Sequence, residues 1–597
     1  MTVKNITTGP TPESGSFGHP RPQLQREWTS LNGTWDFALD ADAKWSRPSH
    51  VQWNTRIEVP FAPETPRSGV NASGYFKACW YKRAFLRPDV RKSDRVVLHF
   101  GAVDYSATVW VNGHFVAEHE GGYTPFTCDV TQYMRGKGPH TVVVRAYDDP
   151  LDMEKPRGKQ EWKRDPHGIW YPRTSGIWQT VWLEVVPATA IETVRWSSSV
   201  RDWCLHLDAG IAGVNADAHK LRVTVSHHGV ELASDTYSVR SNGVERQICL
   251  PDPGIGDARN ELTWHPDRPN LLDVTLEVLD KRGRVVDEVA SYAALREIAW
   301  EGNELTVNGD TIRLRMALDQ GYWPESGMTG DNAQQKRDVE LAKEAGLNGV
   351  RKHQKVEDPR YLYWADRLGL LVWEEMPSAY AFSATSMRRT TAQWMDVLKR
   401  DFSHPCVMAY VPINESWMVP DLPLSEEQRN FVRALFFLTK AFDSTRPVVC
   451  NSGWEAVVDA DIITVHDYDS NPDSFRARYA DLSRLFGGLR PGGKQLLLDD
   501  ADWADKVLGI DEFGGIKFDI DKKEGEQSWG YSEVHSAEEF EQKYGALVRV
   551  IAHHGRIAIW CWTQLTDTYQ EKNGIYTMDR RPKANIERIR HLSWGWN

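Results

Sequence analysis

The chain has 597 residues, more than one hydrophobic core supports, so we expect roughly three or four domains. Hydrophobic residues make up 41% and charged residues 26%, a balance that excludes a mainly disordered or fibrous chain. The net charge of -12 disfavours the clustered basic surface that nucleic-acid binding requires. We therefore expect a globular multidomain protein without a nucleic-acid partner.

Tryptophan content, apolar stretches and cysteine spacing bear on the cellular compartment and on possible ligands. The 26 tryptophans are unusually many, and the flat indole ring suits stacking on sugar rings as well as packing. No stretch approaches the roughly 20 apolar residues of a membrane span, and the leading segment MTVKNITTGPTPESGSFGHP lacks the apolar centre of a signal peptide. Seven cysteines without CxxC spacing predict buried thiols rather than disulfides or a zinc site. These features predict a cytoplasmic protein without a membrane partner.

Short alternating strands dominate the first half of the chain. RVVLHF (95–100), ATVWVNG (107–113) and HTVVVRAY (140–147), separated by turn residues, predict a β-sandwich within residues 1–187. LRVTVSHHG (221–229) and LLDVTLEVLD (271–280) predict an immunoglobulin-like sandwich within residues 188–300.

From residue 301 onward, apolar strands alternate with amphipathic helices, which predicts βα units around a parallel sheet. The predicted strands are residues 312–317, 349–352, 370–374, 407–414, 448–451, 462–466, 508–512 and 557–562. Two predicted helices end at glycines, Gly346 and Gly369, as helix C-termini commonly do. Residues 301–597 are therefore predicted to form a (β/α)8 barrel.

The ends of the predicted barrel strands carry two glutamates. The fourth strand ends at Asn414 and Glu415 and the seventh at Glu512, so the two carboxylates should face each other. Retaining glycoside hydrolysis needs one carboxylic acid to protonate the leaving oxygen and one carboxylate to attack, about 5 to 5.5 Å apart. Arg351, at the end of the second strand, is a candidate to stabilise the attacking anion.

Several segments in order resemble glycoside hydrolase family 2, which contains β-galactosidases, β-glucuronidases and β-mannosidases. LNGTWDF (31–37) and SGIWQTVWLE (175–184) look like its jelly-roll-like sugar-binding sandwich, and PINESW (412–417) and IDEFGG (510–515) look like its barrel motifs. The resemblance spans nearly the whole chain. It implies that Glu415 is the acid/base and Glu512 the nucleophile.

The resemblance also implies positions around the sugar. Asn414 should contact the hydroxyl next to the anomeric carbon, Tyr468 should approach the nucleophile, and Trp560 or Trp562 should line the subsite. The predicted substrate-binding residues are Asn414, Arg351, His353, Gln354, Tyr468, Trp560, Trp562 and Asn573.

Departures from the family pattern leave the sugar open. Family β-galactosidases carry Ser-His-Tyr-Pro after the strand-two arginine, whereas residues 352–355 here read Lys-His-Gln-Lys, which places Gln354 at the usual histidine position. Gly514 and Gly515 stand where those enzymes have a histidine beyond the nucleophile. HGIWYPRT replaces a segment with an aspartate, for which only Asp165 is nearby.

An acidic sugar is a separate hypothesis. Family β-glucuronidases bind the sugar carboxylate with Asn-x-Lys near the last strand, but Asn573 is followed here by Gly-Ile, which disfavours a glucuronide. Lys352, His353 and Lys355 offer an alternative cationic pocket, or else form a solvated rim. No cofactor is predicted. Some family members use magnesium or sodium, but His553 and His554, adjacent in a predicted helix, do not share a face.

We therefore predict an exo-acting retaining β-glycosidase that acts on oligosaccharides or glycosides, most similar to β-galactosidases. A β-glucuronide or β-galacturonide, a β-galactofuranoside and an arabinoside remain alternative substrates, because the fold does not choose among them. A catalytically inactive carbohydrate-binding protein and an adhesion module are alternatives of other classes. The family resemblance also allows a homo-oligomer.

Overall fold

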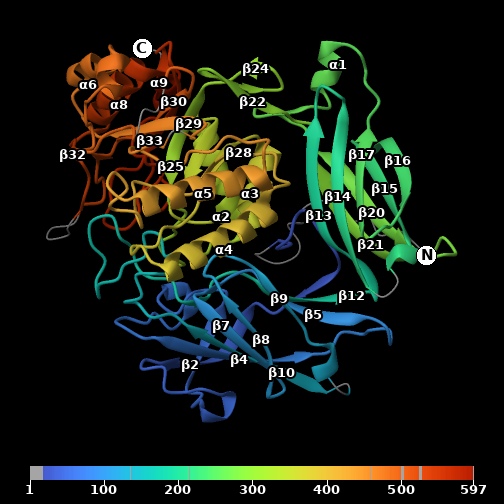
Figure 1. The fold of residues 1–597 in the computed structure, drawn as a ribbon. Helices are drawn as coiled ribbons and strands as arrows, with labels where there is room; N and C mark the ends of the chain where they lie inside the picture. The colour runs from blue at the N-terminus through green and yellow to red at the C-terminus, as the bar shows by residue number, and fades with distance from the viewer. Residues whose placement is uncertain are drawn as a thin grey trace.

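The computed structural model describes residues 18–134, 136, 138–213, 216–457, 459–498, 503–522 and 528–595. Most of the leading segment on which we based the signal-peptide prediction lies outside the described residues. Two strand-rich regions, blue and green in Figure 1, flank a yellow-to-red region in which helices surround a sheet. No described helix combines the length and apolar character that a membrane crossing requires.

The first region is a β-sandwich of a four-stranded sheet, ordered β1-β12-β5-β9, and a six-stranded sheet, ordered β3-β2-β4-β10-β7-β8. Its strands are β1 (Trp28–Ser30), β2 (Gly33–Asp40), β3 (Thr55–Val59), β4 (Ala78–Leu86), β5 (Arg95–Phe100), β6 (Val103–Asp104), β7 (Ser106–Val111), β8 (His114–Glu120), β9 (Phe126–Asp129), β10 (Pro139–Tyr147), β11 (Gly176–Ile177) and β12 (Val181–Val186). Alternate side chains from both sheets, such as Phe37 and Leu98, fill the space between them.

The second region is a sandwich of sheets β13-β14-β17 and β16-β15-β20-β21. Its elements are β13 (Thr189–Ser199), β14 (Cys204–Gly213), β15 (Lys220–His227), β16 (Val230–Ser238), β17 (Gly243–Cys249), α1 (Gly256–Asn260), β18 (Trp264–His265), β19 (Arg268–Pro269), β20 (Leu272–Leu279) and β21 (Val285–Ala293). A small antiparallel sheet of β22 (Ile298–Glu301), β23 (Glu304–Val307) and β24 (Asp310–Thr311) leads into the barrel.

The barrel sheet has the parallel order β28-β27-β26-β25-β33-β30-β29. Its strands are β25 (Leu314–Asp319), β26 (Gly349–Lys352), β27 (Leu371–Glu375), β28 (Val407–Val411), β29 (Ile462–Asp467), β30 (Val507–Gly514) and β33 (Ile557–Thr563), with a minor pair β31 (Ile516–Lys517) and β32 (Ser532–Glu533). Seven of the eight predicted strands are thus confirmed, and buried residues of all seven form one continuous core.

The predicted strand at residues 448–451 forms isolated bridges instead, Tyr410 with Val448 and Asn414 with Ser452. Pro412 lies between these bridges on the neighbouring segment and has no N–H to donate, so the hydrogen-bond ladder is interrupted there. The segment still lies beside β28 and closes the barrel between β28 and β29.

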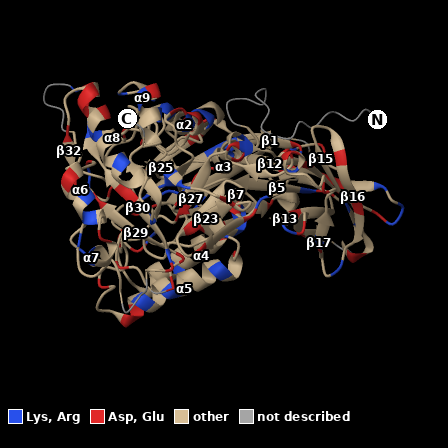
Figure 2. Cartoon of the chain, turned by 90° about the horizontal axis from the view of Figure 1, so that it is seen from above, with Lys and Arg blue, Asp and Glu red and all other residues tan. Residues whose placement is uncertain are grey.

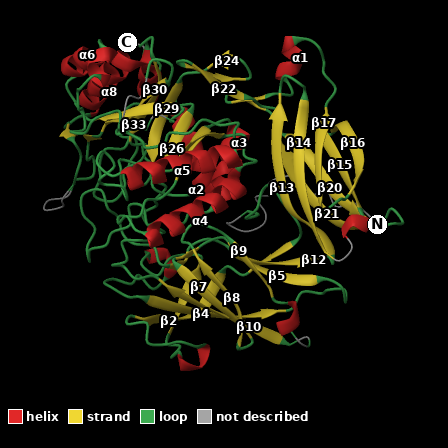
Figure 3. Ribbon diagram, viewed as in Figure 1, coloured by secondary structure: helices red, strands yellow, loops and turns green. Residues whose placement is uncertain are grey.

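Helices cover the outside of the barrel, red around yellow in Figure 3. They are α2 (Asn332–Glu344), α3 (Pro359–Leu368), α4 (Ala384–Asp401), α5 (Glu426–Phe442), α6 (Pro472–Tyr479), α7 (Leu482–Phe486), α8 (Ala537–Ala552) and α9 (Ile586–Ser593). Asp331 and Gln334 form a capping box at the start of α2, and Gly369 ends α3 with a left-handed φ of 71°. Both helices match the sequence prediction.

Polar and sulfur side chains follow two further patterns. In Figure 2, basic and acidic residues are interspersed along the helices and strands in view. All seven cysteines are free thiols and six are buried as predicted, whereas Cys249, at the end of the β17 strand, is exposed. Its side chain points away from the sandwich core because successive residues of a strand face opposite sides.

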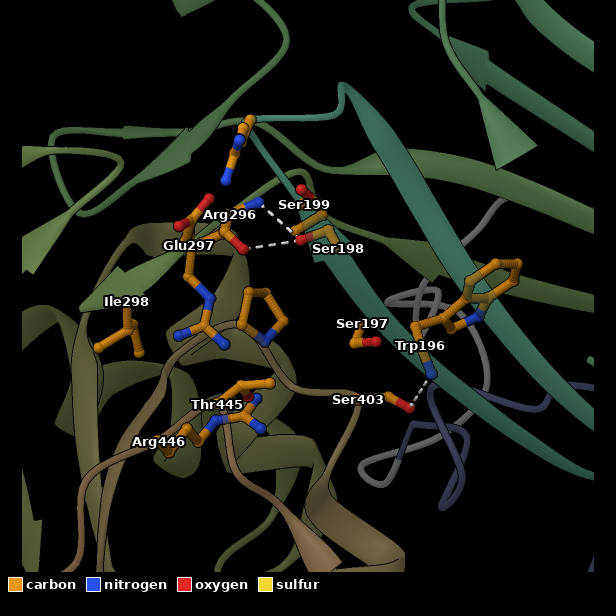
Figure 4. A pocket seen from close by; sticks show the side chains of 13 residues that line it. Trp196, Ser197, Ser198, Ser199, Arg296, Glu297, Ile298, Ser403, Thr445 and Arg446 are labelled. Carbon is orange, nitrogen blue, oxygen red and sulfur yellow. Dashed lines mark hydrogen bonds between the residues drawn. The ribbon is translucent and has the colours of Figure 1, made fainter. Parts of the chain in front are cut away.

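A pocket of about 310 Å³ lies at the junction of the second sandwich and the barrel (Figure 4). The backbone N–H of Trp196, in β13, donates to Ser403 Oγ at 2.9 Å across this junction. Arg446 lines the same pocket and donates to the carbonyl of Val407 at 2.7 Å, where β28 begins. The pocket therefore lies at the N-terminal face of the barrel, where barrel enzymes carry stability rather than catalysis.

Candidate active site

Four charged side chains meet at the C-terminal ends of the barrel strands. Arg351 belongs to β26, His466 to β29 and Glu512 to β30, and Glu415 follows β28. Parallel strands end on one face of a barrel, which brings together residues that are distant in sequence. Glu415 has a positive φ of 51°, a strained conformation for glutamate that the surrounding structure must stabilise.

Glu512 is surrounded by donors. Arg351 Nη1 donates to its Oε1 at 3.1 Å, and the Tyr468 hydroxyl donates to its Oε2 at 2.5 Å. His466 Nδ1 lies 3.5 Å from Oε2. Donors on both oxygens fix the position of this carboxylate.

Arg351 connects the carboxylates to the neighbouring asparagine. Its Nε donates to Glu375 at 2.7 Å and its Nη2 donates to the Asn414 side-chain oxygen at 2.6 Å. Burial lowers the pKa of Arg351, but the charges of Glu375, Asp511 and Glu512 outweigh it and raise the pKa above the ordinary value. The guanidinium also orients Asn414, whose buried Nδ2 has no partner among the described residues and can donate to a substrate hydroxyl.

Glu415 and Glu512 approach each other around His466. Glu415 Oε1 lies 2.8 Å from His466 Nδ1, and one oxygen of each glutamate and a ring nitrogen of His466 lie within 4.8 Å of one another. Burial lowers the pKa of His466, but the charges of Glu512 and Asp511 outweigh it and raise the pKa to about 10. An imidazolium therefore lies against both carboxylates.

Glu415 borders an opening that Glu512 does not. The side chain of Glu415 is 18% exposed and that of Glu512 is 6% exposed. A pocket of about 460 Å³ opens beside Glu415, between Trp454, Tyr468 and Tyr531. The proton donor of a glycosidase needs this position, because the leaving group departs toward solvent on its side.

A segment of the first sandwich covers part of the barrel mouth. The N–H of Tyr380, after β27, donates to the carbonyl of Met153 at 2.9 Å, and Gln570 Nε2 donates to the carbonyl of Trp170 at 2.8 Å. Trp170 stacks on Trp417, two residues beyond Glu415, with ring centroids 6.1 Å apart. Residues 150–175 therefore belong to the rim of the site.

The structure corrects the prediction that Trp560 or Trp562 lines the subsite. Both rings contact Phe513, and Trp562 also packs on Tyr544 of α8, so both side chains point from β33 toward the surrounding helices. Successive residues of a strand face opposite sides. The inward position is therefore the next one along, Thr563, whose Oγ1 lies 3.1 Å from the Tyr468 hydroxyl.

The side chain of Gln354 contacts Ser378, and its role in substrate binding stays a prediction. Its side-chain oxygen accepts from the N–H of Ser378 at 2.8 Å and its amide donates to Ser378 Oγ at 3.2 Å. His353 is nearer the chemistry, with Nδ1 3.9 Å from Glu512 Oε1. Burial and then the charge of Lys159 lower the pKa of His353 well below its ordinary value, so it is a neutral imidazole.

Lys352 and Lys355 form neither a cationic substrate pocket nor a solvated rim. Both are almost fully buried. Lys352 Nζ lies 2.8 Å from Asp319 and 2.7 Å from Glu357, and Lys355 Nζ lies 2.9 Å from Glu357. The sequence could not show this pairing, because Asp319 and Glu357 lie outside the motifs that resemble the family.

Replacement of Lys352 by methionine should destabilise the protein strongly, because Asp319 would lose its buried cation. Breaking a buried ion pair costs about 3–5 kcal/mol of unfolding free energy. Thermal unfolding followed by circular dichroism measures the loss. Lys336→Met, on the exposed face of α2, removes a lysine that is 42% exposed and should leave the midpoint nearly unchanged. Equal midpoints for the two variants would contradict the buried pairing.

Asn573 contacts a second carboxylate, that of Glu571. Its Nδ2 donates to Glu571 Oε1 at 3.0 Å, and the other oxygen of Glu571 accepts from the hydroxyl of Tyr171 in the first sandwich. The Asn573 side-chain oxygen is buried without a partner among the described residues. Asn573 therefore links the barrel to residues 150–175, and no contact places it against the Glu415–Glu512 pair.

Four further residues of the site escaped the sequence prediction: Glu375, Ser452, His466 and Asp511. Ser452 Oγ donates to Asp511 at 2.6 Å and lies 3.0 Å from His466 Nε2. Each of the four ends or directly follows a predicted strand, or adjoins Glu512, so strand-end position was a usable signal. A register shift in β30 between Ile510 and Phe513 brings the consecutive residues Asp511 and Glu512 into one site, which strict alternation does not predict.

Two groups of described side chains have the spacing of metal ligands. One is Glu415, His466 and Glu512. The other contains Asp366, which already accepts from the Tyr292 hydroxyl at 2.8 Å and contacts His404 Nδ1 at 2.6 Å. The hydrogen bonds of Asp366 are thus made within the protein.

His553, predicted to be helical, caps α8 instead, and its neighbour His554 lies beyond the helix.

A barrel with two facing carboxylates at its catalytic face defines the class of glycoside hydrolases. Residues 28–187 match the model described as "Glycosyl hydrolases family 2, sugar binding domain", and residues 298–480 match "Glycosyl hydrolases family 2, TIM barrel domain". The chain belongs to glycoside hydrolase family 2. The predicted multidomain fold with a sugar-binding sandwich and a barrel is thereby confirmed.

Known relatives carry different names. The chain is 27% identical over 405 residues to a β-galactosidase of Thermoanaerobacter pseudethanolicus, with 66% of this chain and 51% of the relative covered. It is 24% identical over 634 residues to a β-glucuronidase of Felis catus, with 97% and 92% covered. The chain thus spans only about half the length of the Thermoanaerobacter pseudethanolicus β-galactosidase.

Solved structures agree on the fold. A family 2 β-galacturonidase from Eisenbergiella tayi, bound to galacturonate, superposes with a TM-score of 0.73 at 18% identity. The superposition covers 96% of this chain and 98% of the other. At that identity the likeness shows the fold alone.

Proposed function

We propose that the protein is an exo-acting retaining β-glycosidase in which Glu512 is the nucleophile and Glu415 the acid/base. The observation that carries this proposal is the approach of Glu415 and Glu512, with oxygens within 4.8 Å across His466. Inverting enzymes hold the two carboxyl groups about 6.5–9.5 Å apart to admit a water molecule, whereas retaining enzymes hold them about 5–5.5 Å apart.

In the proposed mechanism, each step falls to a named residue. Glu512 Oε1 or Oε2 attacks the anomeric carbon while Glu415 gives its proton to the departing glycosidic oxygen. Glu415, now a carboxylate, takes a proton from water as that water attacks the glycosyl ester and releases Glu512. Arg351 and Tyr468 orient Glu512 before attack, and Asn414 offers an N–H without a partner among the described residues to the sugar hydroxyl beside the anomeric carbon.

The substrate that we propose is a β-linked uronide, the alternative considered from the sequence, rather than a β-galactoside. The relatives and structures that align over nearly the whole chain are named β-glucuronidase or β-galacturonidase, whereas the β-galactosidase match covers about half of that relative. The match to a β-galactosidase keeps β-galactosides as the second candidate.

Hydrolysis of nitrophenyl β-glucuronide, β-galacturonide, β-galactopyranoside, β-galactofuranoside and α-L-arabinoside tests the substrate, and proton NMR of the first product tests the stereochemistry. We expect fastest turnover of a β-uronide and initial release of the β-anomer. Initial release of the α-anomer would contradict retention. Turnover of neutral sugars alone would contradict the uronide assignment and leave the catalytic pair standing. Turnover of none would favour the carbohydrate-binding alternative.

A further inference from the structure

Lys159 lies in the segment of the first sandwich that covers the barrel mouth. The N–H groups of Arg157 and Gly158 both donate to the carbonyl of Ser378 at 3.1 Å. Gly158 has a φ of 60°, and a Cβ built there would lie 2.1 Å from the carbonyl oxygen of Gln354. Only glycine permits this close approach, which places the next residue, Lys159, beside the end of β26.

Lys159 is a buried cation without a counter-ion among the described residues. It is 6% exposed, and its ammonium group makes no hydrogen bond or ion pair within the described part of the chain. Its recorded contact is the face of Tyr171, with Nζ 5.8 Å from the ring centroid. Other buried lysines nearby are paired, as Lys352 with Asp319 at 2.8 Å and Lys583 with Asp567 at 2.7 Å. A cation on a largely buried side chain that has no ion-pair partner is available to an anionic ligand.

The end of β26 beside Lys159 leads to the nucleophile. The charge of Lys159 is, after burial, the largest cause that lowers the pKa of His353, the residue that follows β26, and His353 Nδ1 lies 3.9 Å from Glu512 Oε1. Glu571 forms no ion pair with Lys159 in the described part of the chain, and its two oxygens accept from Tyr171 and Asn573. A sugar held at Glu512 would therefore lie on the side of the site where Lys159, unpaired among the described residues, is found.

We propose that Lys159 binds the carboxylate of the uronide in the sugar subsite and determines the preference for acidic over neutral sugars. This inference rests on the proposed uronidase function. It assigns the cationic contact to the first sandwich instead of the barrel segment 571–575, where the Asn-x-Lys pattern is missing and Glu571 supplies a negative charge. Recognition of the substrate then requires two domains.

The test compares Lys159→Met, Lys159→Arg and a control, Lys44→Met, a lysine of the first sandwich that is 75% exposed and lies outside the rim of the site. For Lys159→Met we expect kcat/KM on nitrophenyl β-glucuronide or β-galacturonide to fall about 10- to 100-fold, the range for losing one charged hydrogen bond. Turnover of a neutral nitrophenyl β-glycoside should change by less than about threefold, because it lacks the carboxylate. Lys159→Arg should recover part of the uronide activity, and Lys44→Met should match the unmodified chain.

Binding gives a readout that does not depend on turnover. In a Glu512→Gln background, calorimetric titration with free glucuronate or galacturonate should show an affinity loss with Lys159→Met similar to the kinetic loss. Equal losses on uronide and neutral substrates would indicate a structural role and overturn the inference. Full uronide turnover by Lys159→Met would overturn it while leaving the proposed function intact. Absence of uronide turnover by the unmodified chain would overturn both.

Discussion

Replacement of Glu512 by alanine should lower kcat on every glycoside by on the order of 10⁵-fold, because no other group can form the covalent intermediate. Arg351 and Tyr468 would remain and would leave an anion-sized site lined by donors. Azide should occupy that site and attack in place of the carboxylate, so that the isolated product is an α-glycosyl azide. Nitrophenol release and NMR of the azide product measure the two effects.

Glu538→Ala, an exposed glutamate in the first turn of α8, is the matched control and should retain full activity. Circular dichroism of the Glu512→Ala variant separates loss of the nucleophile from loss of the fold. Residual hydrolysis within about tenfold of the unmodified chain would rule Glu512 out as the nucleophile. A β-azide product would show that another carboxylate acts as the nucleophile in this chain.

Replacement of Glu415 by alanine should have a different signature. General acid–base catalysis contributes about 10²- to 10⁴-fold, so we expect a loss of that size for substrates with poor leaving groups. A nitrophenyl leaving group needs little protonation, so its first step should be nearly normal and the glycosyl-enzyme should accumulate as a burst. Azide should rescue the second step and give a β-glycosyl azide, the anomer opposite to that expected from Glu512→Ala.

The pH profile supplies an independent check on Glu415. Loss of the proton donor should remove the fall in rate on the basic side, because that fall reports deprotonation of the acid. Glu415→Gln retains a side-chain oxygen that can accept from His466 at the 2.8 Å contact, and so separates acid/base loss from displacement of His466. An unchanged bell-shaped profile in Glu415→Ala would assign the acid/base role elsewhere.

The alternation of apolar strands with amphipathic helices made the barrel strands predictable from sequence. The two glutamates were predictable because they stand at the ends of such strands. The strand at residues 349–352 and the helix that ends just before Gly346 match the structure because the local hydrophobic period and the terminal glycine define them. Prediction of side-chain direction was weaker. Trp560 and Trp562 face the helices while Thr563 faces the site, a difference of one residue that hydrophobicity does not report when both strand faces are buried.

Charge pairing was the other limit. The Lys-His-Gln-Lys run at 352–355 suggested a substrate pocket, yet Lys352 and Lys355 bind Asp319 and Glu357 inside the barrel. No sequence motif singles out Lys159, because nothing in its neighbouring residues distinguishes a surface lysine from one that the fold buries. Only the approach of the first sandwich to the barrel separates these lysines.

The sequence by itself determined the family, the barrel and the two glutamates at its strand ends, because period, glycine positions and motif order are local properties of the chain. The tertiary structure decided which charges remain unpaired near those glutamates. Electrostatic interaction acts over a few ångströms in space whatever the separation in sequence, so residues 194 positions apart, such as Lys159 and His353, influence each other only after folding.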